Sequence, residues 1–204
     1  MAQIDTDYLI VGAGALGLSF ADALLDHSDA HITFVDQHPK PGGHWNVAYP
    51  FVTLHQPSAN SGPNSMDMGD DRIDSAGPNE GFYELATGTQ VLSYFERAMH
   101  ERFIPSGRVS YYPMSKYQLS ESGEHSFVSS LAGKEAQVNV RRKLVDCRTF
   151  TASVPATHKR KFDITDGVQL TTPGKLPEAW MGGANPPEHY VIMGAGKTAM
   201  DVGV

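Results

Sequence analysis

Two glycine-rich turns are the residues of this chain whose types and spacing could do chemistry. The first is Gly12-x-Gly14-x-x-Gly17, and the second, Gly-Ala-Gly-Lys-Thr-Ala, begins at Gly194, 182 positions after the first. In such a motif the first glycine permits a tight turn and the second lets the backbone approach a pyrophosphate. The third small residue lets a helix pack closely on a strand. Both turns therefore predict dinucleotide binding.

The residues around the first motif predict a strand, a helix and a second strand. Apolar runs at 8–11 and 31–35 predict the strands, and a helix is expected between them, ending near residues 26–29. Apolar residues at helical spacing predict the buried side of this helix: Leu16, Phe20, Ala23 and Leu24. Its free N–H groups would face the phosphates. Asp36 follows the second strand, 19 positions after Gly17, where an acid takes the ribose hydroxyls. Because a 2′-phosphate would meet like charge there, the first site favours FAD or NAD over NADP.

The second motif has a predicted strand before it, at 189–193, and a predicted helix beginning near Gly196. Ala199 takes the third small position. A phosphate loop is excluded, because that motif needs a glycine where Val191 stands. The helix would have barely two turns before the last residue and would be marginal alone. We therefore expect the chain to be the N-terminal portion of a longer protein, with a genuine short terminal helix as the alternative.

One further helix is predicted between the motifs, over 89–103, with Thr87 or Thr89 as its cap. Its apolar stripe comprises Val91, Leu92, Phe95, Met99 and Phe103. Before it, residues 55–82 are rich in Pro, Ser, Gly, Asn and Asp. A loop of that length in a compact domain is either functional or mobile.

The turn residues after this helix predict a small antiparallel β meander at about 108–142, with 109–112 as its first strand. Residues 143–147 predict one more strand, in which Cys147 would be buried and inert. The expected organisation has three parts: a first dinucleotide-binding domain at 1–150, an irregular connector at 151–188 and the truncated start of a second such domain at 189–204.

Composition excludes several other classes of protein. The 204 residues include 16 basic and 23 acidic side chains, a formal charge of −7, and the acidic excess lies in residues 1–104. This balance argues against a nucleic-acid partner. One cysteine excludes an internal disulfide, a Cys-x-x-Cys pair and a cysteine zinc site, and no metal is expected. No apolar run approaches the roughly 18 residues of a membrane span, and no signal peptide is visible, so a cytoplasmic protein is predicted.

Taken together, the motifs resemble those of flavoproteins with two dinucleotide-binding domains. Within this group the chain is most similar to the flavin-containing monooxygenases and the related Baeyer–Villiger enzymes. The resemblance rests on the first motif with its acid, on Gly42-Gly43-His44-Trp45, and on the second motif with Asp201 after it. It implies an α/β, Rossmann-like FAD/NAD(P)-binding fold with a parallel sheet and a small antiparallel β meander.

The resemblance also implies which residues hold the cofactors. FAD would be held by Gly12, Gly14, Ala15, Leu16, Gly17, Asp36, Gln37, Gly43, His44 and Trp45. The site for NADPH, or for NADH, would begin with Gly194, Gly196, Thr198 and Ala199. The implied reaction is reduction of FAD by NADPH, after which the flavin oxidises a small molecule. His55 and Gln56 are candidates to contact the flavin or substrate, with ordinary loop residues as the alternative.

Two other functions remain open on the sequence. A flavin oxidase or dehydrogenase of the amine-oxidase type shares the first motif, the acid and a later Gly-Gly pair, but should lack a second motif. A non-catalytic, truncated nucleotide-binding module is the other alternative. The pattern names neither the substrate nor an oligomeric state.

Overall fold

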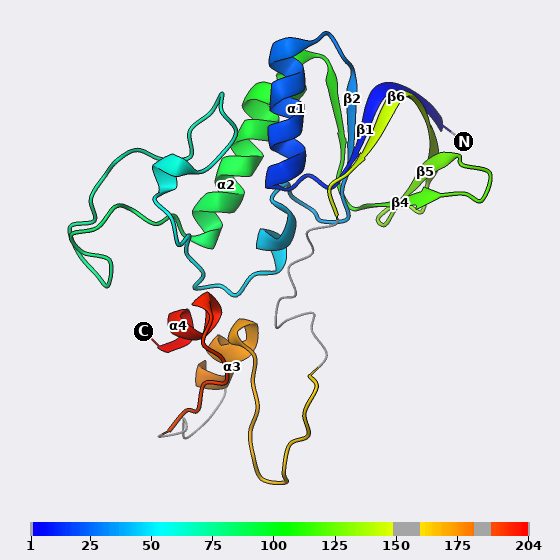
Figure 1. The fold of residues 1–204 in the computed structure, drawn as a ribbon. Coiled ribbons are helices and arrows are strands. Elements are labelled where there is room, and N and C mark those ends of the chain that lie inside the picture. Colours follow the sequence, from blue (N-terminus) through cyan, green and yellow to red (C-terminus); the bar gives the residue numbers. More distant parts are fainter. Residues whose placement is uncertain (1, 149–159, 182–188, 204) are drawn as a thin grey trace.

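Six strands form one mixed sheet in a computed structural model, which describes residues 2–148, 160–181 and 189–203 (Figure 1). The strand order is β3-β2-β1-β6-β5-β4. The parallel strands are β3 (Val109–Tyr112), β2 (Ile32–Val35), β1 (Ala2–Val11) and β6 (Glu135–Asp146). The antiparallel strands beside β6 are β5 (His125–Ser129) and β4 (Ser115–Leu119). The predicted α/β fold, with a parallel sheet and a small meander, is confirmed.

The first βαβ unit forms as predicted. Helix α1 (Ala15–His27) joins β1 to β2, and Ile10 pairs with Phe34 in the parallel register. Both of these side chains are fully buried under the helices, and their neighbours Leu9, Val11 and Val35 are buried on the other face, against the meander. The apolar runs at 8–11 and 31–35 therefore correctly predicted strands, and these strands are buried on both faces.

The predicted buried side of α1 is wrong at Leu16, Phe20 and Ala23, which are exposed, whereas Leu24 packs against the core. Leu16 and Phe20 are 55% and 38% exposed, whereas Gly17, Leu18, Ala21 and Leu25 face the core. The third glycine decides this orientation, because a Cβ atom on Gly17 would lie 2.3 Å from the Gly12 carbonyl oxygen. The helix must turn Gly17 toward β1 to pack this closely, and that rotation carries Leu16 outward.

The second long helix confirms its prediction. Helix α2 (Gly88–Ala98) continues as a π-helical turn, η3 (Met99–Phe103), and Val91, Phe95, Met99 and Phe103 are buried. Thr87 is the cap: its hydroxyl accepts from the Gln90 N–H, and the Gln90 side chain accepts from the Thr87 N–H. This reciprocal capping satisfies two N–H groups that the helix leaves free.

The meander differs from the prediction at its first strand. Residues 109–112 form β3, which pairs parallel with β2 and so belongs to the parallel sheet. The meander comprises β4, β5 and the start of β6. The end of the predicted meander and the strand predicted at 143–147 are one strand, β6, which pairs with β5 at its start and with β1 along its length. The pairing with β1 continues through the join, with a register shift between Thr6 and Tyr8, so no turn separates the two parts.

In the described segments 160–181 and 189–203 the chain forms short helices and no strand. Within the described part of the connector predicted at 151–188 lie η5 (Pro173–Lys175) and α3 (Leu176–Met181). The strand predicted at 189–193 is absent: Val191 is 91% exposed, and no described strand lies beside this segment to pair with it. Helix α4 (Lys197–Gly203) begins where predicted. Residues 149–159 and 182–188 lie outside the described ranges.

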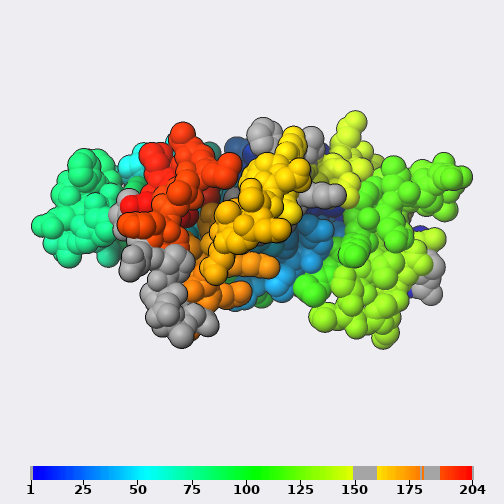
Figure 2. All heavy atoms as spheres, turned by 90° about the horizontal axis from the view of Figure 1, so that it is seen from below, coloured from blue at the N-terminus to red at the C-terminus, as the bar shows by residue number. Residues whose placement is uncertain are grey.

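The carboxyl ends of β1 and β2 define the lower end of the domain in Figure 1, and residues 160–181 and 189–203 lie beneath it. Seen from below, these two segments cover part of that end, and atoms coloured blue are visible beside them, toward the green atoms of the meander (Figure 2). Within the described ranges, no helix is both long and apolar enough to cross a membrane. Residues 55–82 are mostly loop, as predicted, with one short helix, η2 (Ser58–Asn60).

Candidate functional site

The first glycine motif forms a tight turn between β1 and α1. Gly12 has φ +106°, a conformation that L side chains rarely adopt, and its N–H donates to the Val35 carbonyl at 2.9 Å. Gly14 is the N-cap residue of α1 and makes no side-chain capping bond. The three glycines therefore occupy the positions that the motif requires: the turn, the close approach and the helix–strand contact.

The Gly-Gly-x-Trp segment packs directly on this turn. The Gly42 N–H donates to the Ala13 carbonyl at 2.8 Å. A Cβ atom on Gly14 would lie 3.4 Å from the Gly43 Cα, and one on Gly43 would lie 3.2 Å from the Gly14 Cα. The two backbones thus meet where both residues lack side chains, and two motifs that are 25 or more positions apart form one surface.

Asp36 is buried at the end of β2, with 4% of its surface exposed. One carboxylate oxygen accepts from the Ala13 N–H at 2.5 Å, and the other accepts from the His38 N–H at 2.7 Å. The carboxylate therefore ties the second strand to the glycine turn. A carboxylate offers about four lone-pair positions, so these two bonds leave acceptor capacity for the hydroxyls of a ribose.

The N-terminus of α1 is open to an anion. This helix has no capping side chain and no acidic residue in its first turn, so the N–H groups at Ala15, Leu16 and Gly17 have no partner within the helix. Ala15 and Leu16 are exposed. Free N–H groups and the positive end of the helix dipole favour phosphate at such a position.

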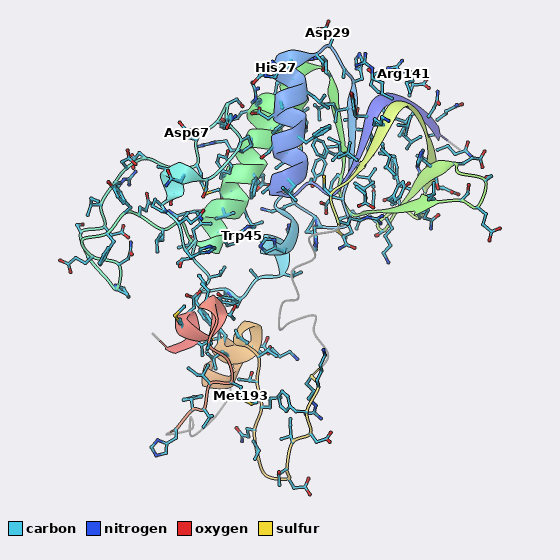
Figure 3. The ribbon with its side chains drawn as sticks, in the orientation of Figure 1. His27, Asp29, Trp45, Asp67, Arg141 and Met193 are labelled. Carbon is cyan, nitrogen blue, oxygen red and sulfur yellow. The ribbon has the colours of Figure 1, made fainter. Side chains whose placement is uncertain are left out.

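His44 and Trp45 lie in the short helix η1 (Gly43–Val47), immediately after the glycine pair. Their rings stack with centroids 5.5 Å apart, and Trp45 also packs against the main core. Neighbouring atoms desolvate His44 and lower its pKa, although the residue reaches solvent. Figure 3 shows Trp45 at the lower end of the domain, opposite His27 and Asp29. Gln37 is exposed beside Asp36.

The two candidates in the following loop are not drawn into this site. His55 and Gln56 are both exposed, and the described residues include no hydrogen-bond partner for either side chain. The neighbouring Leu54 N–H bonds to the Ala86 carbonyl at 2.8 Å, which fixes the loop backbone against the start of α2. Their role in contacting a flavin or substrate stays a prediction.

The second glycine motif is separate from the first. Gly194 has φ +140°, and Ala199 lies 3.5 Å from a Cβ built on Gly194, whereas one built on Gly196 would meet nothing within 4 Å. The predicted residues of this site, Thr198 and Ala199, lie in α4 and are half-buried. Lys197, beside them, donates to the Thr53 carbonyl at 2.5 Å.

Sequence reasoning missed the residue that joins the parts of the first site. Ala13 donates its N–H to Asp36 and accepts from Gly42 through its carbonyl, so it links the turn, β2 and the Gly-Gly-x-Trp segment. Both contacts use the backbone, so no side chain could have revealed them. Tyr111 on β3 packs against the main core. Its buried hydroxyl has no hydrogen-bond partner among the described residues, and burial, with Asp36 as a nearby negative charge, raises its pKa.

Comparison with known proteins agrees with this geometry. Residues 10–68 match the family described as NAD(P)-binding Rossmann-like domain, a stretch that holds the glycine turn, Asp36 and the Gly-Gly-x-Trp segment. The fold of the described residues is α/β and Rossmann-like. Uncharacterized proteins of Mycobacterium bovis and Mycobacterium tuberculosis are each 42% identical to it over 199 residues, 98% of this chain. The chain spans about a third (35%) of the length of these relatives.

Solved structures share the fold of this domain. A bacillithiol disulfide reductase from Bacillus cereus superposes with a TM-score of 0.54 at 10% identity, over 70% of this chain and 39% of that one. A polycyclic ketone monooxygenase from Thermothelomyces thermophila gives 0.53 at 17% identity, over 72% and 23%. At these identities the likeness shows the Rossmann-like fold.

Proposed function

We propose that the first glycine motif and the Gly-Gly-x-Trp segment together bind FAD, in an NAD(P)H-using oxidoreductase of the monooxygenase type. The observation that carries this proposal is the contact between Gly14 and Gly43. A glycine turn that only binds a dinucleotide does not need a separate glycine pair, such as Gly42-Gly43, packed on it. Here two side-chain-free backbones meet beside an uncapped helix N-terminus, which gives an extended cofactor a surface longer than one turn.

The residues present fit a dinucleotide in three respects. A Cβ atom on Gly14 or Gly43 would fill the contact between the two segments. The first turn of α1 has no acid to repel a pyrophosphate. Asp36 is already oriented by two backbone N–H groups, so its carboxylate is fixed before any ribose binds.

Each part of the site then has one task. The N–H groups of Ala15 and Leu16 would bind the pyrophosphate, and Asp36 would accept hydrogen bonds from the ribose. Gly43 and Trp45 would lie toward the flavin ring. When bound, the flavin supplies the redox chemistry, taking a hydride from reduced nicotinamide and passing electrons to oxygen or a small molecule.

The second motif supports use of NADPH or NADH, and it speaks against an oxidase of the amine-oxidase type. Gly194 adopts a φ that favours glycine, and Ala199 occupies the third small position near it. We place the start of the nicotinamide site at Gly194, Gly196, Thr198 and Ala199. The substrate is a small molecule whose class the described residues do not define.

The direct test is the visible absorbance of the purified chain after it has been mixed with FAD and desalted. We expect retained flavin bands, and we expect Asp36→Ala to remove them because the ribose then loses its acceptor. Asp29→Ala is the matched control: Asp29 is exposed and lies at the opposite end of the domain (Figure 3). Loss of flavin from both variants, or retention by both, would contradict the assignment of Asp36.

NAD(H) at the first motif is the second candidate, because the matching family is described by NAD(P). Titration of the same chain with FAD and with NADH separates the two. Quenching of flavin fluorescence that excess NAD⁺, which cannot reduce the flavin, does not reverse supports FAD. A chain that stays colourless with FAD but binds NADH overturns the proposal in favour of a nicotinamide site.

A further inference from the structure

Helix α4 is poorly equipped to exist alone. It has seven residues, fewer than an isolated helix needs in water. Its charges also oppose the helix dipole, with Lys197 in the first turn and Asp201 toward the C-terminal end. The preceding residues give it little support, because Val191 and Met193 are 91% and 71% exposed. Contacts from elsewhere in the chain must therefore stabilise it.

Those contacts gather at one place, the segment that follows Gly-Gly-x-Trp. The Tyr49 hydroxyl donates to the Asp201 carboxylate at 2.6 Å. The Lys197 ammonium donates to the Thr53 carbonyl at 2.5 Å, pairs with the same carboxylate, and lies 6.0 Å from the Tyr49 ring centroid. Figure 1 shows α4 directly beneath this segment. Within the described ranges, the hydrogen bonds between residues 160–203 and the sheet domain are made by Tyr49 and Thr53 on the side of the sheet domain.

The cluster is partly shielded from water, which strengthens it. Tyr49 is 9% exposed, and the Lys197 and Asp201 side chains are 29% and 19% exposed. Burial, followed by the hydrogen bond to Asp201, raises the pKa of Tyr49 to about 12, so its hydroxyl stays a neutral donor at physiological pH. A carboxylate held by both a hydroxyl and an ammonium is the centre of this contact.

We propose that Tyr49 and Thr53 are the docking site of the second glycine motif, and that Tyr49 is a positioning residue. Through Asp201 and Lys197 it holds α4, and with it Gly194–Ala199, against the chain four residues beyond Trp45. This contact sets where the second motif lies relative to the first. The docking does not depend on either cofactor. The docking proposal can therefore be wrong while the FAD assignment is right, and the FAD assignment can be wrong while the docking proposal is right.

Hydrogen–deuterium exchange of the full chain, followed by mass spectrometry, tests the docking through Asp201→Ala. Alanine is a better helix former than aspartate, and this change also removes an acid from the wrong end of the dipole. A helix that stands on its own propensity would therefore exchange more slowly. A docked helix would exchange faster, by about tenfold or more, the factor expected for losing a hydrogen bond to a charged group.

Tyr49→Phe should accelerate exchange in α4 in the same direction, and should add little when it is combined with Asp201→Ala, because both changes remove one shared bond. Tyr94→Phe is the matched tyrosine control, since that hydroxyl donates to the Met66 carbonyl away from α4. Met200→Ala is the control within α4, because Met200 is 61% exposed.

Exchange in β1 and α1 reports whether each variant is folded. The proposal is overturned if α4 exchanges at the rate of unstructured chain in the unmodified protein. It is equally overturned if Asp201→Ala slows or leaves unchanged the exchange of α4 in a variant whose β1 and α1 remain protected.

Discussion

The two glycine motifs share a spacing, yet the chain surrounds them differently. At the first, β1 lies between β2 and β6, and Gly17 packs so closely that a Cβ atom would stand 2.3 Å from a backbone oxygen. At the second, the residues immediately before Gly194, 189–193, form no strand. A Cβ atom on Gly196 would meet nothing within 4 Å. The first helix has 13 residues and the second has seven.

This difference shows what a glycine motif specifies and what it does not. In both places a glycine takes a positive φ and a helix begins a few residues later. The strand, in contrast, forms only where neighbouring strands satisfy its backbone and bury its side chains. Ile10 before the first motif is fully buried, whereas Val191 before the second is 91% exposed.

The largest expected difference concerns one ion pair at each helix: the pair at α1 joins it to η3, whereas the pair at α4 lies within the helix. Arg102 pairs at 2.6 Å with Asp22 of α1, whose side chain is 3% exposed, whereas Lys197 pairs with the more exposed Asp201 of α4. Arg102→Met leaves a buried carboxylate without its cation and should lower the free energy of unfolding by about 3–5 kcal/mol. Lys197→Met should lower it by less than about 1 kcal/mol. Urea unfolding measures both, and equal losses would contradict the contrast.

One glycine from each motif, Gly17 and Gly196, gives the next effect. Gly17→Ala should lower the free energy of unfolding by about 1–3 kcal/mol, because the new methyl group overpacks against the Gly12 carbonyl. This exceeds the gain of about 1 kcal/mol that alanine brings to a helix. Gly196→Ala is the comparison in the second motif, where Ala199 already takes the third position. A Cβ atom on Gly196 meets nothing within 4 Å, so this change should leave the unfolding midpoint where it is. A destabilising Gly196→Ala would mean that the second turn is also closely packed.

Helix caps supply the smallest effect. α2 begins with the Thr87–Gln90 capping box, whereas α1 begins at Gly14 without a cap. Thr87→Ala should lower the free energy of unfolding by about 1 kcal/mol. It should not change FAD retention, because the proposed phosphate site uses the uncapped helix. Thermal unfolding measures the loss of stability, and the desalting experiment measures FAD retention. Loss of flavin from Thr87→Ala would contradict the expected retention.

Much of the first region could be predicted from sequence, because its signals are local. Apolar runs identified β1 and β2, the glycine spacing identified the turn, and Asp36 stood where the pattern placed it. The buried side of α1 could not be predicted from apolar spacing, since the close packing of Gly17 overrides Leu16 and Phe20. The contact between Tyr49 and Asp201 joins residues 152 positions apart, so no local pattern encodes it.

The account's central claim is that the first motif and the Gly-Gly-x-Trp segment form one cofactor site. Hydrogen–deuterium exchange of the full chain with and without FAD tests it most directly. We predict that FAD slows exchange most in two peptides at once, one covering residues 12–18 and one covering residues 36–47. Protection confined to residues 190–203, or protection of the glycine turn with no change in the Gly-Gly-x-Trp peptide, would contradict the claim.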